Sequence, residues 1–207
     1  MKGYTLFSFL CLLALVLATT FGVAQENRRR VGERPDPNTQ GTVYVSGSAW
    51  PHPTTFADLC RTADAIIDGT VTSSLPARRS IPDVPYTLET DAVIAVNKVL
   101  KGSQDLKTIM VAESGGVQGG VKVINQNNLL MVPRERYVLF LLKEDRTGLP
   151  MMPGVPRYAV IAATEGKFLV ENDTVQIITR APSAVQSQYR GNGIGAFEAA
   201  IMAQVGK

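Results

Sequence analysis

Two carboxylates with a spacing suited to catalysis, Glu89 and Asp91, occupy alternate positions of one predicted strand in this 207-residue chain. Alternate side chains of a strand share a face, so the two carboxyl groups are expected roughly 6–7 Å apart, within the range of glycosidase acid and base pairs. The opposite face of the strand carries the apolar residues Leu88, Ala92 and Ile94, which predicts that Glu89 and Asp91 lie on a solvated face. Solvated carboxylates at alternate strand positions are common without catalysis, and we favour that interpretation over a glycan-acting enzyme.

His52 is the sole histidine, and it stands between two prolines. A metal site or a proton shuttle needs partners at fixed spacing, and no cysteine or second histidine lies nearby. Unless His52 folds back onto the core, a Ser-His-Asp or Cys-His arrangement is also excluded, and the chain has no Gly-x-Ser-x-Gly turn. We therefore predict no metal, no cofactor and no enzymatic activity, and we interpret His52 as an exposed linker residue.

Four glycines between positions 115 and 120 could cradle a phosphate. They lack a following Gly-Lys-Ser/Thr and precede a predicted strand rather than a helix N-terminus, so a mobile loop is the better interpretation. A second loop, 73–85, is rich in proline and arginine. Both loops are expected at the ends of a rigid core, where binding residues commonly lie. The predicted contact residues are Arg78, Arg79, Glu113, Ser114, Gly115, Gly116, Gln118 and Gly119.

The core that positions these loops is organised around residues 137–142, six consecutive apolar residues bounded by charges. Such a run is too short to span a membrane and is typical of a strand buried on both faces. Further strands are predicted at 65–72, with a bulge at Gly69, and at 86–100, 107–113 and 157–163. A hairpin is predicted from 167–171 and 174–179, joined at Asn172 and Asp173. A possible arm at 121–124 follows the glycine loop.

Two helices are predicted to flank this core. Phe56, Leu59 and Cys60 recur at helical spacing after a Thr-Thr cap, which indicates a short N-terminal helix. Ile194, Phe197, Ile201 and Val205 mark one face of a C-terminal amphipathic helix that follows a polar link.

The N-terminus has the features of a secretory signal peptide: Lys2, an apolar run over 6–18, and small residues before Gln25. Cleavage is predicted after Ala24, and no transmembrane helix is expected after signal removal, which places the protein outside the cell or in the periplasm. Residues 25–53 then form a polar linker rich in proline, glycine and arginine, within which 42–45 could add an edge strand.

Cys11 falls inside the predicted signal, so Cys60 is alone in the mature chain and the fold must hold by packing without an intramolecular disulfide. We expect Cys60 to be a small buried group. The formal net charge of +3, from 21 basic and 18 acidic residues, is too mild to favour nucleic acid. Candidate aromatics for stacking bases are also scattered along the chain. An unidentified protein or cell-envelope component is therefore the expected partner.

The order of these elements, together with the segments 99–102 (Val-Leu-Lys-Gly) and 134–141 (Arg-Glu-Arg-Tyr-Val-Leu-Phe-Leu), resembles uncharacterised secreted bacterial β domains. More distantly it resembles the netrin-like module of tissue inhibitors of metalloproteinases. The resemblance covers about residues 56–179 and implies a small barrel of the oligonucleotide/oligosaccharide-binding (OB) type. We therefore expect a mainly β protein with this barrel at 54–180, and the residue pattern adds the link and helix at 181–207. It does not carry the inhibitory activity, because the N-terminal cysteine that chelates the protease zinc in those inhibitors is missing here.

The sequence thus predicts an exported, non-enzymatic binding or protein-interaction module. Two alternatives stay open. One is a netrin-like protease inhibitor that lacks the chelating cysteine, and the other is a glycan-acting enzyme that uses Glu89 and Asp91.

Overall fold

The structure is a computed structural model that describes residues 41–45, 52–81, 87–144, 152–179 and 182–206. These residues belong to one compact unit, Gln40–Lys207. The predicted signal peptide (1–24) and the arginines at 28–30 lie outside the described residues, as does most of the predicted linker.

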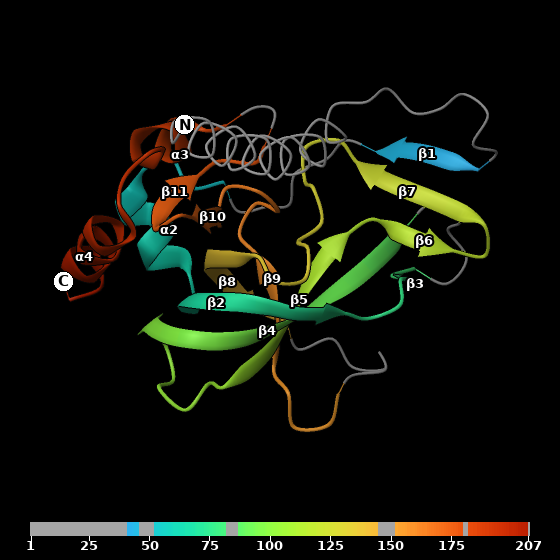
Figure 1. Cartoon of the computed structure of the whole chain (residues 1–207), viewed down its shortest axis with the longest axis horizontal. Helices are drawn as coiled ribbons and strands as arrows, with labels where there is room; N and C mark the ends of the chain where they lie inside the picture. The colour runs from blue at the N-terminus through green and yellow to red at the C-terminus, as the bar shows by residue number, and fades with distance from the viewer. Residues whose placement is uncertain (1–40, 46–51, 82–86, 145–151, 180–181, 207) are drawn as a thin grey trace, which may run out of the picture. The chain divides into compact units, whose positions relative to one another are not determined.

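Five strands close into a barrel, which confirms the predicted fold class (Figure 1). They are β2 (Ala65–Ser74), β4 (Leu88–Lys101), β5 (Thr108–Ser114), β8 (Arg136–Lys143) and β9 (Arg157–Val160). The order is β8-β2-β4-β5-β9, and β9 pairs back onto β8. The β5–β9 pair is parallel and the other four pairs are antiparallel. This arrangement is that of an OB-like barrel.

Strand β8 is buried on both faces because it separates two hydrophobic cores. Its residues Tyr137, Leu139 and Leu141 point into the barrel, where they join the inward residues of β2, β4, β5 and β9. The intervening Val138 and Phe140 pack outside the barrel, against the helices and a β-hairpin. A strand between two cores needs apolar residues at every position, so the central strand predicted from the sequence is confirmed.

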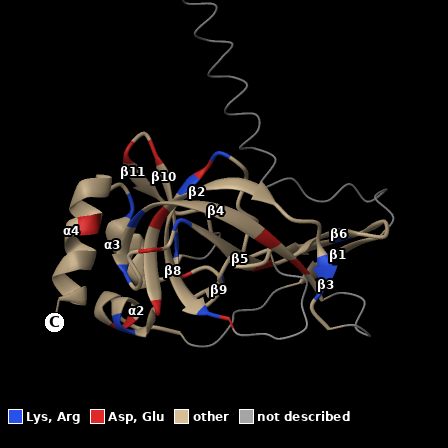
Figure 2. Ribbon diagram, turned by 90° about the horizontal axis from the view of Figure 1, so that it is seen from below, with Lys and Arg blue, Asp and Glu red and all other residues tan. Residues whose placement is uncertain are grey.

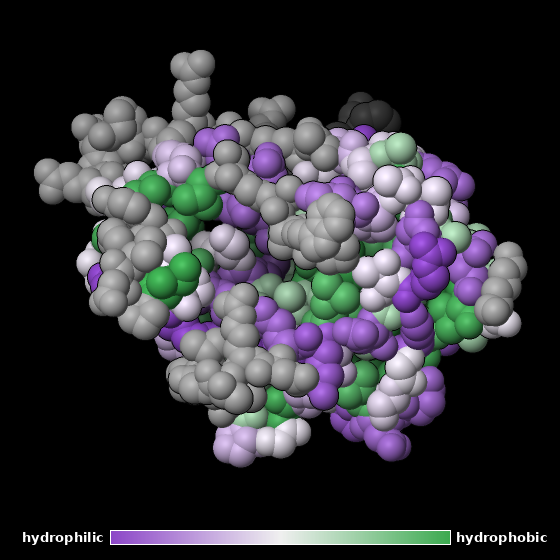
Figure 3. Space-filling view, turned by 180° about the vertical axis from the view of Figure 1, so that it is seen from behind, coloured by the Kyte–Doolittle hydropathy of each residue, from purple (hydrophilic) through white to green (hydrophobic). Residues whose placement is uncertain are grey.

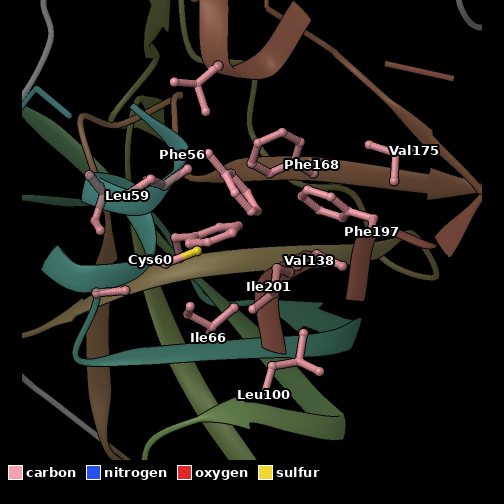
Figure 4. Packing of buried hydrophobic residues seen from close by; sticks show 14 of the residues in the cluster. Phe56, Leu59, Cys60, Ile66, Leu100, Val138, Phe168, Val175, Phe197 and Ile201 are labelled. Atoms are coloured by element: carbon pink, nitrogen blue, oxygen red, sulfur yellow. The ribbon is translucent and has the colours of Figure 1, made fainter. Parts of the chain in front are cut away.

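The outer core lies between the barrel wall and a cap of helices with one hairpin. The elements of this cap are α2 (Phe56–Thr62), α3 (Ala184–Tyr189), α4 (Ile194–Val205), β10 (Lys167–Glu171) and β11 (Thr174–Gln176). Phe56, Phe140, Phe168 and Phe197 form a ring cluster at its centre, with several ring centroids 4.8 to 6.4 Å apart (Figure 4). The hairpin and both predicted helices are confirmed.

Cys60 lies in this outer core and is a free thiol with 2% exposure, as the sequence predicted. Helix α3, by contrast, was missed in a stretch read as a polar link. Its signal is a capping box, in which the Ser183 side chain accepts from the Gln186 backbone while the Gln186 side chain accepts from the Ser183 N–H.

Gly69 marks an irregularity in the antiparallel pairing of β2 with β4, as predicted. The pairing register shifts between Asp68 and Gly69. A Cβ atom on Gly69 would lie 2.5 Å from Cγ2 of Ile94 on the paired strand, so the Ile94 side chain leaves no room for a side chain at position 69.

A separate three-stranded sheet lies on the side of the barrel away from the helices (Figure 1). It comprises β1 (Thr42–Val45), β7 (Val121–Asn125) and β6 (Gly116–Gln118), in that order. The edge strand predicted at 42–45 is therefore confirmed, and it pairs in parallel with β7. The glycine loop, however, is not a loop throughout, because its residues 116–118 form β6 and its last two glycines form a two-residue turn. Among the described residues no helix is long and apolar enough to cross a membrane.

Candidate ligand-binding site

A buried ion-pair network lies at the end of the barrel where β3 (Arg78–Arg79) pairs with the start of β4. Its centre is Arg157 on β9, whose side chain is completely buried. Arg157 Nε donates to Asp91 Oδ1 at 3.0 Å, and its two terminal nitrogens contact Glu89 and Glu144. Figure 2 shows the basic residues of β3 close to acidic segments of the barrel. We call Arg78, Glu89, Asp91, Glu144 and Arg157 the Arg157 network.

Arg78 contributes the second cation of the network. Its Nη2 donates to Glu89 Oε1 at 3.1 Å, and its Nη1 lies 2.6 Å from Asp91 Oδ2, an ion-pair contact without hydrogen-bond alignment. Burial alone would lower the pKa of Arg157, but its hydrogen bond to Asp91 and the charges of Glu89, Asp91 and Glu144 together raise that pKa. The arginine therefore stays charged.

The expectation that Glu89 and Asp91 lie on a solvated face is wrong. Glu89 is 8% exposed and Asp91 is fully buried. The sequence shows their alternation but not their partner Arg157, which is 66 residues from Asp91. A carboxylate that is enclosed by two guanidinium groups lacks the access to water and to a substrate that a glycosidase pair needs.

The network anchors the segment that carries β3. Leu75 N donates to Asp91 O at 2.8 Å, and Ser80 N donates to Thr87 O at 2.7 Å. The pairs Arg78 with Glu89 and Arg79 with Leu88 continue the ladder. Because Arg78 is fixed in the network, the next residue, Arg79, is directed to the opposite face, where its side chain is exposed.

A pocket of about 360 Å³ opens on that face, between the β3–β4 ladder and the β6–β7 hairpin. This volume falls within the roughly 300–1,000 Å³ typical of small-ligand sites. The residues lining the pocket are Arg79, Leu88, Gln118, Gly119 and Val121. They combine one cation, one amide and two aliphatic side chains with the backbone of a turn.

Glycines allow the β6–β7 hairpin to approach β3 and β4. A Cβ atom on Gly116 would collide with Thr90 Oγ1 and would come 2.5 Å from the Cβ of Ala77. Gly115 N donates to Leu88 O at 2.8 Å, and Thr90 Oγ1 donates to Gly115 O at 2.8 Å. Gly115 and Gly116 both have φ values, 123° and 135°, that disfavour other residues.

The eight predicted contact residues therefore separate into groups. Arg79, Gln118 and Gly119 line the pocket. Gly115 and Gly116 hold the hairpin in place, and Ser114 pairs with Glu89 in the ladder. Arg78 belongs to the Arg157 network.

Glu113, the remaining predicted contact residue, is 2% exposed and is paired with the buried Lys167. Lys167 Nζ donates to Glu113 Oε1, Asn128 Oδ1 and Leu129 O, each at 2.6 Å. Glu113 Oε2 also accepts from Met131 N at 2.7 Å. This second ion pair fixes the segment before β8 to the barrel, so Glu113 has a structural environment rather than a surface one.

Sequence reasoning missed two pocket residues, Leu88 and Val121, because leucine and valine on a strand usually belong to the hydrophobic core. The network residues Glu144 and Arg157 were missed because an isolated charge at the end of a strand gives no sign of a partner far away in the sequence. The sequence does hold a signal for Val121. The two glycines at 119 and 120 are typical of a two-residue turn, which would place Val121 opposite Gln118.

Within the described ranges, no three His, Cys, Asp or Glu side chains are grouped as a metal site would require. On the face seen in Figure 3, hydrophobic atoms reach the surface in separate groups bordered by hydrophilic ones. No family model matches this chain, and no curated protein matches it.

Proposed function

We propose that the protein is an exported, non-enzymatic binding module whose ligand site is the pocket between the β3–β4 ladder and the β6–β7 hairpin. The observation that carries this proposal is the pocket itself. It lies between the two segments that the sequence singled out as binding loops, and three of the predicted contact residues line it.

The mechanical arrangement supports a binding role. One wall of the pocket is fixed by the buried Arg157 network, and the other by the close packing of Gly116 against Ala77 and Thr90. A pocket between rigid walls loses little conformational entropy on binding, which favours affinity. The OB-like barrel adds support by analogy. OB-folds commonly bind ligands on the face of their second and third strands and at the loop between the first and second strands. In this barrel those strands correspond to β4 and β5, and that loop contains β3.

Export is part of the proposal and follows from the N-terminal sequence. A mature chain with Cys60 as its sole thiol has no intramolecular disulfide, and the fold instead relies on two hydrophobic cores and two buried ion-pair clusters. Intact-mass measurement of the protein from its natural host should give a chain that begins at Gln25.

The narrower, netrin-like resemblance would make the protein a metalloprotease inhibitor. The OB-like strand order favours it, but Cys60 is buried on α2 and cannot reach the zinc of a protease. An inhibition assay against a zinc metalloprotease separates the two proposals, and we expect no inhibition.

Amide chemical shifts in ¹⁵N-labelled protein test the main proposal. A library of small fragments (carboxylates, amides, short peptides and sugars) should contain members that shift the amides of Arg79, Gln118 and Gly119 in a saturable manner. Saturable shifts confined to other parts of the surface, or no saturable shift at all, would contradict it.

A further inference from the structure

We propose that the site takes an extended, uncharged peptide segment of a partner protein. The segment adds as a short strand to the outer edge of β6 and places one aliphatic side chain in the pocket. This inference rests on the proposed function and names the ligand class. Two features carry it: the outward-facing backbone of Val117, and a pocket lining in which the one charged side chain is already engaged.

The first feature is the backbone of β6 at its outer edge. Gln118 and Val121 flank a two-residue turn, so they form a hydrogen-bonded pair. The next pair, Val117 with Lys122, must then direct its backbone groups away from the hairpin. This is seen directly on β7, because Lys122 N donates to Gly41 O at 2.9 Å. The N–H and C=O of Val117 correspondingly point outward on the other side.

The outer edge of β6 is not paired with another described strand. The order of the small sheet is β1-β7-β6, so β7 is the neighbour on one side and the other side is an edge (Figure 1). Strand β4 begins at Leu88, whose carbonyl accepts from Gly115 N just before β6 starts. Within the described part of the chain, the outward N–H and C=O of Val117 have no partner. Such an edge is a template for a further strand.

The second feature is the chemistry of the pocket lining. Leu88 and Val121 present aliphatic side chains, and Gln118 presents an amide. Among the described residues of the lining, Arg79 is the one with a charged side chain, and it already interacts with another group of the protein. A charged ligand group would therefore lose hydration without gaining a partner of its own. An aliphatic side chain gains free energy from leaving water, and about 360 Å³ is ample room for it.

An added strand that runs antiparallel to β6, as β4 runs to β5, uses both features. The residue opposite Val117 exchanges two hydrogen bonds with it and directs its side chain to the Val117 face. The preceding residue lies opposite Gln118. Its side chain therefore points to the face that Gln118 shares with Val121, which is the face of the pocket. Recognition by strand addition combines backbone hydrogen bonds for affinity with pockets for alternate side chains.

A second copy of this chain fits the same edge less well than a peptide does. If two β6 strands paired antiparallel about Val117, Gly116 of one copy would lie opposite Gln118 of the other. Glycine has no side chain to place in the pocket. A second copy would thus leave the pocket empty, whereas a peptide with an aliphatic residue at this position fills it.

Fluorescence anisotropy with labelled pentapeptides tests the ligand class. The probe is a threonine pentapeptide with leucine at the central position, and the comparison peptides carry glycine, glutamate or lysine there. We expect the leucine peptide to bind roughly 10-fold or more tightly than each of the other three, as burial of an aliphatic side chain allows. Methylation of the backbone nitrogen after leucine should weaken binding, because that N–H faces Val117. Methylation of the leucine nitrogen, which faces away, should not.

Two variants at one position test the edge of β6 from the protein side. Val117→Pro removes the outward N–H without removing a bond to β7, since proline is tolerated where the N–H of an edge strand faces solvent. It should weaken binding of the leucine peptide by about 5-fold, the typical effect of one lost hydrogen bond. Val117→Thr keeps the N–H and should bind as the native protein does. If Val117→Pro disturbs the hairpin, the methylated peptides still test the same bond, because they leave the protein unchanged.

Equal binding of the leucine and glycine peptides, a preference for glutamate or lysine, or equal effects of the two methylations would each overturn the inference. A dimer in sedimentation equilibrium that Val117→Pro abolishes would overturn it in favour of a second copy. If small fragments shift the amides of Arg79, Gln118 and Gly119 but the leucine peptide does not bind, this inference fails while the proposed function stands. If no probe shifts these amides, both fail.

Discussion

Replacing Arg157 with methionine should destabilise the protein substantially, because the change leaves buried carboxylates without their main partner. Removing one member of a buried ion pair typically costs about 3–5 kcal/mol. Here Glu89 and Glu144 keep side-chain exposures of 11% and 13%, so water can partly hydrate them, but Asp91 has none. Arg78 remains 2.6 Å from Asp91 and offsets part of the loss. We therefore expect a loss near the lower end, about 3 kcal/mol.

Urea denaturation followed by far-ultraviolet circular dichroism measures this effect. With a slope of about 2 kcal/mol/M, a loss of about 3 kcal/mol lowers the midpoint by roughly 1.5 M. The control is Arg61→Met, which removes an arginine whose side chain is 76% exposed and paired with Asp58 on the same helix. It should leave the midpoint unchanged. Adding Asp91→Leu to Arg157→Met should recover part of the loss, because the unpaired charge is then gone.

Hydrogen exchange of backbone amides provides a local measurement beside the global stability. In Arg157→Met, the carboxylates of Glu89 and Asp91 that hold Arg78 are no longer fixed by Arg157. Backbone amides in residues 75–81 should therefore exchange hydrogen faster relative to those of α4. A midpoint shift no larger than that of Arg61→Met, or unchanged exchange in residues 75–81, would refute the view that the Arg157 network fixes this wall of the pocket.

Three further perturbations test other parts of the structure. Gly69→Ala should cost about 1–3 kcal/mol by overpacking against Ile94. Gly195→Ala, in an open helical position of α4, should instead stabilise by about 0.4–1 kcal/mol. Equal effects in thermal unfolding would contradict the close packing of Ile94 against Gly69. Lys167→Met should destabilise the protein by about 3–5 kcal/mol because Glu113 is left buried and unpaired. The double variant Glu113→Gln/Lys167→Met should be more stable than Lys167→Met. A double variant that is less stable than Lys167→Met in urea denaturation would argue against a buried ion pair. Burial raises the pKa of the Cys60 thiol to about 11 from a usual value of 9.0. The unfolded state therefore loses this proton at lower pH than the folded state, and the stability should fall as the pH rises from 9 through 11. Cys60→Ala should reduce that fall, and an unaltered pH dependence of stability in this variant would contradict the burial of the thiol.

Parts of the barrel and of its cap could be predicted from the sequence because their signals are local. The run at 137–142, the glycine at position 69 and the Asn172–Asp173 turn each act within a few residues, and both turn residues adopt the positive φ values that a tight hairpin needs. The glycine segment was read as a mobile loop because glycine has weak strand propensity. Its β6 portion forms through pairing with β7, which a single segment does not reveal.

The candidate site was only partly predictable for the same reason. Arg79, Gln118 and Gly119 were found because they lie in segments rich in glycine and proline. Arg78 and Glu113, which lie nearby in the sequence, have the same composition around them, yet the fold engages both in ion pairs with buried partners. Whether a charged residue faces a pocket or a buried partner depends on strand register and on residues far away in the chain, such as Arg157 and Lys167.

The most direct test of the ligand site compares two tryptophan substitutions at adjacent positions of β7. Val121→Trp adds bulk inside the pocket, and Lys122→Trp adds the same group on the opposite, exposed face of the strand. Amide-shift titrations with a fragment that binds the native protein should show binding abolished in Val121→Trp and retained in Lys122→Trp. Equal binding by the two variants would contradict the assignment of the pocket as the ligand site.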